Sequence, residues 1–247
     1  VALPILSAMK IHCSVIPTAI LSNHTDYPEY FFKDFTPYIE EYVDNWRKLN
    51  LSFNGIATGF LGSLEQIAIV THIIEEFPSD LVLIDPVMGD NGHLYDTYTD
   101  SMCNAMKKLI GHGTIITPNL TEACILGDIP YAKHICESEL FALCNKISEL
   151  GPTSIVITDI PAGQYIGCYV YQQGEGELIL NPLITPTRPG TGDVFASVLA
   201  GAILHDYELK AGVKKATDFI SSCLKHSALL DIPVNDGVCF EEFLNTL

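Results

Sequence analysis

Residues 188–197 have the sequence Arg188-Pro189-Gly190-Thr191-Gly192-Asp193-Val194-Phe195-Ala196-Ser197. Glycine at positions 190 and 192 permits tight backbone angles and leaves the amide groups uncovered. The apolar residues that follow have helical spacing, so the stretch predicts a glycine turn leading into a helix. Such a helix start offers N–H donors and the positive end of the helix dipole to an anion. Asp193 could there accept a proton from an attacking hydroxyl, whereas the simpler alternative is that Thr191 or Asp193 only caps the helix.

Composition restricts the class of ligand. The chain has 247 residues, of which 48% are hydrophobic, so it is long enough to bury a substantial core. Its formal net charge is −17, from 30 acidic and 13 basic residues. Nucleic acids and anionic membranes attract clustered lysine and arginine, so neither is an expected partner. A nucleotide is still compatible, because backbone amides and a metal ion can bind its phosphates.

The cysteine pattern indicates a reducing compartment. None of the eight cysteines forms a Cys-x-x-Cys pair, which argues against a zinc knuckle or a redox motif. Several lie in apolar patterns, where cysteine behaves as a small hydrophobic residue. No apolar run reaches the roughly 18 residues of a membrane span. The sequence therefore predicts a cytoplasmic protein.

Strand and helix patterns alternate along the chain. We expect an α/β fold, with a mostly parallel central sheet and helices on both of its faces. The predicted strands include residues 11–21, 53–60, 81–84, 114–116 and 154–157, and the predicted helices include residues 36–49, 64–77, 100–110 and 137–150. Residues 164–184 predict a small antiparallel hairpin at one side. No repeat or linker divides the sequence, which indicates a single domain over residues 1–247. Ligands of such sheets bind beyond the carboxyl ends of the strands.

Two of these strand ends have candidate metal and nucleotide ligands. Asp85 and Asp90 follow the apolar run 81–84, and two carboxylates there could hold Mg²⁺. They could equally be a turn cap and a solvated loop acid. Thr117, Asn119 and Glu122 follow the next strand, and Asn119 and Glu122 are spaced to converge on one face of a helix start. The same spacing is that of a capping box.

Together the three strand ends supply what phosphoryl transfer needs. That reaction uses a metal ion on the phosphate oxygens, donors for the charge of the moving group, and a base for the acceptor hydroxyl. Asp85, Asp90 and Glu122 could bind the metal, directly or through water. The turn 190–192 could supply the donors, and Asp193 the base. The chain has no Gly-x-x-x-x-Gly-Lys-Ser/Thr motif, so the P-loop mode of nucleotide binding is absent.

These motifs, in this order, resemble the signature of the ribokinase-like superfamily. They are Asp85-Pro86-Val87-Met88-Gly89-Asp90, Thr117-Pro118-Asn119-x-x-Glu122 and Pro189-Gly190-Thr191-Gly192-Asp193. Over nearly its whole length the chain is most similar to bacterial pyridoxal/pyridoxamine kinases, also through residues 1–7, 21–25, 58–63 and 190–199. The resemblance implies ATP- and Mg²⁺-dependent phosphorylation of the 5′-hydroxymethyl group of a B6 vitamer. It further implies a homodimer and a monovalent cation, K⁺ or Na⁺, near the site.

The resemblance also assigns roles by position. It implies that Asp193 is the catalytic base and that Gly190, Thr191 and Gly192 form the anion hole. Residues around ATP would be Asp90, Thr117, Asn119, Glu122, Thr158 and Gly192, and those around the metal Asp85, Asp90 and Glu122. The acceptor pocket would include Ser22, His24, Thr25, Phe60, Tyr95 and Asp193. Without the resemblance, residues 24 and 25 would be read as an ordinary polar turn. Phe60 and Tyr95 would be read as ordinary core or surface aromatic residues.

Three departures from the family pattern concern the acceptor side. Family members begin with a strand and a serine-bearing loop that would precede Val1. Phe60 replaces a tyrosine that is common in the family, and Asp26 stands where glycine is frequent. We therefore expect the sheet to lack its first strand and the acceptor pocket to lack one wall.

Alternative functions remain open from the sequence. A hydroxymethylpyrimidine (phosphate) kinase shares the fold and nucleotide, but typically has cysteine at the position of Asp193. A sugar kinase usually adds a large lid of extra strands, for which residues 15–53 offer no room. A catalytically silent homologue that binds vitamer or nucleotide is the alternative outside enzymes, and the presence of Asp193 and Glu122 argues against it.

Overall fold

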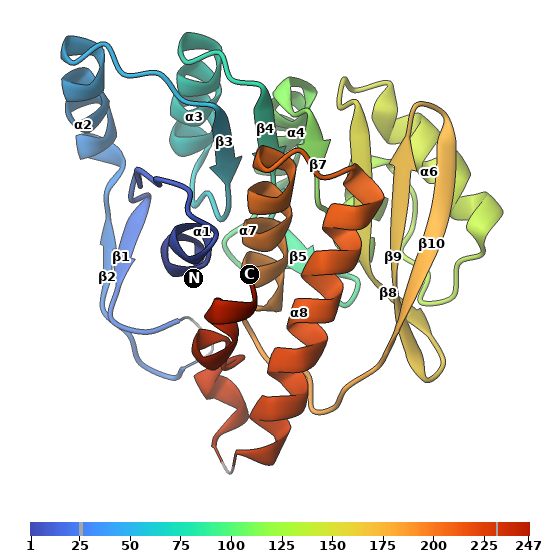
Figure 1. The fold of residues 1–247 in the computed structure, drawn as a ribbon. Helices are drawn as coiled ribbons and strands as arrows, with labels where there is room; N and C mark the ends of the chain where they lie inside the picture. Colours follow the sequence, from blue (N-terminus) through green and yellow to red (C-terminus); the bar gives the residue numbers. More distant parts are fainter. Residues whose placement is uncertain (25–26, 231) are drawn as a thin grey trace.

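A six-stranded sheet forms the centre of the protein (Figure 1). The computed structural model describes residues 1–24, 27–230 and 232–247. The strand order is β10-β9-β8-β7-β4-β3, in which β3, β4, β7 and β8 run parallel and β9 and β10 are antiparallel additions at one edge. The bounds are β3 (Gly55–Thr58), β4 (Leu81–Ile84), β7 (Ile115–Ile116), β8 (Ser154–Ala162), β9 (Tyr165–Gln172) and β10 (Glu175–Pro182). The predicted mostly parallel sheet with an antiparallel hairpin at one side is confirmed, and the hairpin belongs to the main sheet.

Helices cover both faces of this sheet. One face carries α3 (Leu64–Glu76), α4 (Asp100–Leu109), α5 (Leu120–Leu126) and α6 (Glu137–Ser148), and the other α1 (Ala2–Ala8), α7 (Thr191–Leu204) and α8 (Leu209–Leu229). Strand β4 shows why helices are needed on both faces of the sheet. Val82 and Ile84 pack into the core on the first face, and Leu81 and Leu83 into the core on the second. All four side chains are buried, as expected of a central parallel strand.

Smaller elements complete the chain. Helix α2 (Thr36–Lys48) packs against α3 through a third apolar cluster that includes Ile39, Val43 and Ile73. Two short antiparallel ribbons lie outside the main sheet, β1 (Ala19–Leu21) with β2 (Phe32–Asp34) and β5 (Gly89–Asp90) with β6 (His93–Leu94). The 3₁₀ helices are η1 (Ile110–His112), η2 (Val234–Asp236) and η3 (Glu241–Thr246). The β1–β2 ribbon has three residues a strand, consistent with the expected absence of a large lid.

The predicted buried strand over residues 11–21 is wrong. Only residues 19–21 form a strand, and it pairs with β2 in a partly exposed ribbon. Ile11 and Cys13 instead pack against the α1–α7 core without strand pairing. Pro17 lacks the N–H that a ladder needs, and residues 11–18 are half-buried or exposed. Apolar content alone does not distinguish such an extended covering segment from a strand.

Two further observations concern helix length and the cysteines. Within the described residues, no helix combines the length and apolar character needed to cross a membrane. All eight cysteines are free, and Cys103, Cys124, Cys144, Cys168 and Cys223 are buried.

Candidate active site

The turn at Gly190 adopts a backbone that only glycine takes without strain. Gly190 has φ +88° and is the N-cap residue of α7, and Val194 N–H donates to its carbonyl at 3.1 Å. A Cβ built on Gly192 would meet nothing within 4 Å. The amide groups of the first turn of α7 have no partner within the helix. The glycine turn predicted from the sequence therefore exists and presents free backbone to whatever binds there.

Asp193 lies in the first turn of α7. Solvent reaches the residue, yet neighbouring protein atoms desolvate the carboxyl group and raise its pKa. Its backbone carbonyl accepts from Ser197 Oγ at 2.6 Å, within the helix. A carboxyl group with a raised pKa is a stronger base once ionised.

Asp85 follows β4 directly and is 8% exposed. Burial raises its pKa to about 7, with further contributions from the negative charges of Asp193 and Asp159. Thr117 Oγ donates to Asp85 Oδ1 at 3.3 Å, which partly opposes the shift. The sequence analysis predicted these residues from three separate motifs. In the structure, Asp85 is hydrogen-bonded to Thr117 and lies close enough to Asp193 to feel its charge.

Glu122 is a capping-box residue, as the simpler alternative proposed. Its Oε1 accepts from Met88 N at 3.0 Å and its Oε2 from Asn119 N at 2.8 Å, while Asn119 Oδ1 accepts from Glu122 N at 2.9 Å. Asn119 Nδ2 also donates to the carbonyl of Gly89 at 2.8 Å. Glu122 is 3% exposed, and burial followed by the charge of Asp85 raises its pKa. Both oxygens are thus used to join the loop after β4 to the start of α5.

The metal role of these acids stays a prediction. In the part of the chain that the structure describes, no three His, Cys, Asp or Glu side chains are placed to hold a metal ion together. Asp90 is exposed at the end of β5, and its two oxygens accept from the backbone and side-chain nitrogens of Asn91 at 2.7 and 2.8 Å. Asp90 accepts one backbone hydrogen bond, from Asn91 N, whereas both oxygens of Glu122 accept from backbone amides and Asp85 accepts from the Thr117 hydroxyl.

Asp159 belongs to this group, and the sequence reasoning missed it. The predicted strand 154–157 continues to Ala162, with a register shift between Ile157 and Ile160 that contains Thr158 and Asp159. Asp159 has φ +56°. Solvent reaches the residue, yet desolvation of its carboxyl group by neighbouring protein atoms, with the charge of Asp90, raises its pKa to about 6. Thr158 N donates to the carbonyl of Pro118 at 2.8 Å, beside the Asn119 cap. A carboxylate next to a predicted phosphate-binding threonine is the signal that could have identified it.

The predicted acceptor residues lie on several loops. Ser22 Oγ accepts from Phe31 N at 2.9 Å, and His24 Nε2 lies 2.5 Å from the carbonyl oxygen of Asn235. Thr25 lies outside the described residues. Phe60 follows β3 and Tyr95 follows β6, and both are exposed. Tyr98 O–H donates to the carbonyl of Leu61 at 3.1 Å, which joins the two loops that carry these rings.

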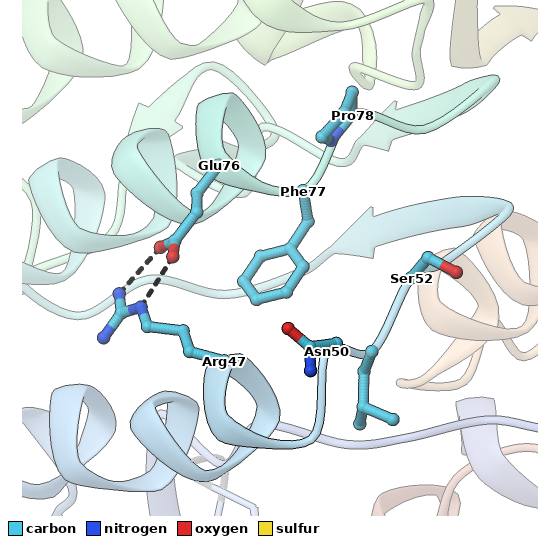
Figure 2. Close-up of a pocket in the computed structure, with 7 residues that line it drawn as sticks. Arg47, Asn50, Ser52, Glu76, Phe77 and Pro78 are labelled. Carbon is cyan, nitrogen blue, oxygen red and sulfur yellow. Dashed lines mark hydrogen bonds and ion pairs between the residues drawn. The ribbon is translucent and has the colours of Figure 1, made fainter.

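A surface pocket elsewhere does not compete with this site. Figure 2 shows it, lined by Arg47, Asn50, Leu51, Ser52, Glu76, Phe77 and Pro78. Its residues precede β3 and β4, so it lies at the amino edge of the sheet, opposite the strand ends described above. Arg47 is held there by Glu76 in two hydrogen bonds of 2.7 Å and also donates to Glu40 and Asp44. Its guanidinium is engaged by carboxylates, which leaves it poorly suited to bind an anionic ligand.

The raised pKa of Asp85 predicts how stability depends on pH. A carboxyl group with a higher pKa in the folded state binds more protons when folded, so its contribution is full below about pH 4 and is lost as pH rises toward 7. We expect Asp85→Asn to raise Tm at pH 8 by about 2–6 °C and to lose this advantage near pH 4. Thermal unfolding from pH 4 to 8 without added metal tests this. Asp80→Asn, an exposed residue just before β4, is the control. A pH-independent difference would contradict the assignment.

Comparison with known proteins agrees with this architecture. A crystal structure of a protein from Bacteroides thetaiotaomicron VPI-5482, provisionally named a phosphomethylpyrimidine kinase, superposes with TM-score 0.97 at 35% identity, covering 99% of this chain and 86% of that one. A second crystal form of it, with pyridoxal, gives TM-score 0.93 at 35% identity over 99% and 88% of the two chains. Pyridoxal kinase from Lactobacillus plantarum gives TM-score 0.93 at 27% identity over 99% and 89%.

Sequence comparison leads to the same group. The chain is 27% identical to pyridoxine/pyridoxal/pyridoxamine kinase of Bordetella avium (strain 197N), over 94% of this chain and 81% of the relative. The predicted resemblance to B6-vitamer kinases, which are phosphotransferases with an alcohol acceptor, is confirmed. Residues 3–235 match the model of the phosphomethylpyrimidine kinase family, and the chain therefore belongs to that family.

Proposed function

We propose that this protein is an ATP- and Mg²⁺-dependent kinase that phosphorylates the 5′-hydroxymethyl group of pyridoxal, pyridoxamine or pyridoxine. The observation that carries the proposal is the position of Asp193, in the turn that follows the positive-φ Gly190 and in electrostatic contact with Asp85. A base, a set of free backbone donors and a group of acids are then available at one edge of the sheet. ATP and acceptor are the expected small-molecule partners.

In this proposal Asp193 accepts the proton of the acceptor hydroxyl as the hydroxyl oxygen bonds to the γ-phosphorus of ATP. The bond from that phosphorus to the β,γ-bridging oxygen breaks, and ADP is the leaving group. The amides of Gly190, Thr191 and Gly192 donate to the phosphoryl oxygens, where negative charge develops. Asn119 and Glu122 hold the loop that carries Asp90 against the start of α5, and Thr117 orients Asp85. Thr158 is expected to contact phosphate from the register shift in β8.

The acids fit a divalent cation. The charge of another acid contributes to the raised pKa of each of three carboxyl groups, those of Asp85, Asp159 and Glu122. A cation among them would therefore relieve their mutual repulsion. Asp85 and Asp90 would hold Mg²⁺, with Glu122 contributing through water because its oxygens already accept from backbone amides. Bound Mg²⁺ supplies charge neutralisation on the phosphate oxygens of ATP.

A pyrimidine substrate is the second candidate, because the family model bears the name of phosphomethylpyrimidine kinase. Two observations favour a B6 vitamer. The structural relative at 35% identity has a crystal form with pyridoxal. Asp193 also stands where the pyrimidine kinases typically have cysteine. A catalytically silent binding protein is the remaining alternative.

A substrate panel tests the proposal. ATP consumption with Mg²⁺ is measured in parallel with pyridoxal, pyridoxamine, pyridoxine and hydroxymethylpyrimidine as acceptors. We expect the highest kcat/KM on a B6 vitamer. Preference for the pyrimidine would move the protein to the second candidate, and no turnover with ATP still bound would favour a silent homologue.

Further parts of the proposal concern organisation. Residues 1–247 would form one ribokinase-like kinase domain of a cytoplasmic homodimer, with K⁺ or Na⁺ near the site. Sedimentation measurements and turnover in K⁺, Na⁺ or neither salt check the dimer and the monovalent cation.

A further inference from the structure

Arg188 is a buried cation at the start of the glycine motif. The residue is 6% exposed, and its guanidinium donates to the backbone carbonyls of Pro233 (2.8 Å), Gly237 (3.3 Å), Ser227 (3.2 Å) and Ile232 (3.3 Å). Arginine can do this because its planar group presents five donors in fixed directions. The side chain thus joins the segment before the anion-hole turn to the end of α8 and to the loop 232–239, which we call the C-terminal loop.

The C-terminal loop is fastened to the same turn by its backbone. Val238 N donates to the carbonyl of Pro189 at 3.3 Å. Gly237 has φ +84°, and a Cβ there would lie 3.3 Å from the same carbonyl oxygen. Ser227, fully buried, accepts from Cys239 N at 2.9 Å through its Oγ. These contacts fix the loop directly beside Pro189 and Gly190.

The other side of the C-terminal loop contacts His24, a predicted acceptor residue, and Tyr27. We call residues 22–24 and 27–31 the acceptor segment. His24 Nε2 lies 2.5 Å from the carbonyl oxygen of Asn235, and Tyr27 O–H donates to Asp236 Oδ1 at 2.7 Å. The rings of His24 and Tyr27 also lie against each other, with centroids 4.7 Å apart. One short loop therefore touches the anion-hole turn on one side and the acceptor segment on the other.

We propose that Arg188 is a positioning residue that couples the acceptor segment to the anion-hole turn through the C-terminal loop. The inference rests on the proposed kinase function of this site. In-line transfer needs the acceptor oxygen and the amide donors of the anion-hole turn in one fixed geometry. A small displacement of either lowers the reaction rate strongly. Arg188 holds the C-terminal loop through hydrogen bonds to backbone carbonyls, and it acts on the acceptor segment only through that loop, without itself touching the reacting atoms.

The central test is Arg188→Lys, which keeps the charge but replaces a planar fork by a single rotatable ammonium. We expect kcat/KM for the acceptor to fall by about tenfold to 10²-fold, the range for misplaced reactants, with a smaller change in KM for ATP. Arg47→Lys is the matched control, since Arg47 also makes several hydrogen bonds but lies at the opposite edge of the sheet. Its kinetics should equal those of wild type.

A second variant tests the outer link and does not disturb the core. Tyr27→Phe removes only the hydroxyl that donates to Asp236. We expect KM for the acceptor to rise roughly three- to tenfold, the value of one hydrogen bond, with KM for ATP unchanged. In the Arg188→Lys background the added effect of Tyr27→Phe should be smaller, because the loop is already loosened.

The outcomes separate this inference from a purely structural role and from failure of the proposed function. Folded Arg188→Lys with all constants within twofold of wild type would overturn the coupling. If that variant does not fold, an unchanged acceptor KM in Tyr27→Phe overturns it. If wild type phosphorylates none of the four acceptors, the function fails, and amide hydrogen exchange decides the coupling. Faster exchange at residues 27–31 in Arg188→Lys supports it, and unchanged exchange there rejects it.

Discussion

Asp193→Asn is expected to lower kcat by roughly 10²–10⁴-fold, the usual contribution of a general acid–base group, while ATP and acceptor still bind. The substitution keeps the size of the side chain and removes its capacity to accept a proton. Ser197 Oγ donates to the backbone carbonyl of residue 193, so the first turn of α7 is expected to survive. Steady-state ATP consumption gives kcat, and titration calorimetry gives the two binding constants.

The matched control for this variant is Asp206→Asn. Asp206 is exposed just beyond the other end of α7 and has φ +59°, a conformation that asparagine accepts readily. The control makes the same chemical change just past the far end of α7 and should leave kcat unaltered. Turnover of Asp193→Asn within a few-fold of wild type would remove Asp193 from the role of base.

Local patterns were sufficient for most of the fold. The continuous apolar run 81–84 predicted a strand covered on both faces, and β4 indeed contributes alternate residues to two cores. The same criterion failed for residues 11–21, because an apolar segment can pack under helices without joining a ladder. Propensity within a segment carries no information about whether a partner strand lies beside it.

For the site, sequence spacing predicted contacts within a motif better than contacts between motifs. The Asn119–Glu122 box is local and was predicted at the right residues. The glycine turn does lead into α7, but the alternative that Thr191 or Asp193 caps the helix is wrong, because Gly190 is the N-cap residue and no side chain caps it. Asp159 lies in a register shift of β8, where neighbouring protein atoms desolvate its carboxyl group and raise its pKa, and no local pattern reveals this. Arg188 was quoted in the glycine motif, but its partners lie about 40 residues later in the chain, since the separation from Ser227 is 39. Such long-range hydrogen bonds depend on the assembled fold.

The anion-hole turn yields a prediction in which stability and activity separate. Gly190→Ala places a Cβ on a residue with φ +88°, and Gly174→Ala does the same at φ +78° in the β9–β10 turn. Neither Cβ would meet a close neighbour, so each variant should lose about 1–2 kcal/mol of stability from backbone strain alone. Gly174 lies at the amino edge of the sheet, since residue 172 pairs with Ser154 at the start of β8. It is therefore a control for strain without proximity to the site.

Gly192→Ala tests the same turn without backbone strain, because Gly192, unlike Gly190 and Gly174, does not have a positive φ. A Cβ at Gly192 meets no protein atom within 4 Å, and alanine favours helix more than glycine does by up to about 1 kcal/mol, so Tm should be equal to or above that of wild type. If the phosphoryl group lies against this backbone, the added methyl group occupies its space. We then expect kcat to fall by roughly 10²-fold, comparable to the loss of one oxyanion donor.

Measured together, the three alanine variants distinguish an anion hole from a merely tight turn. We expect Gly174→Ala to lose stability and keep kcat, Gly190→Ala to lose both, and Gly192→Ala to keep stability and lose kcat. Thermal unfolding gives Tm, and ATP consumption gives kcat, for each variant. If Gly192→Ala turned over at the wild-type rate, the open space above its Cα would not be where the phosphoryl group binds. Loss of activity without loss of stability at that position has no explanation in the packing of the protein itself, because no protein atom is there to be displaced.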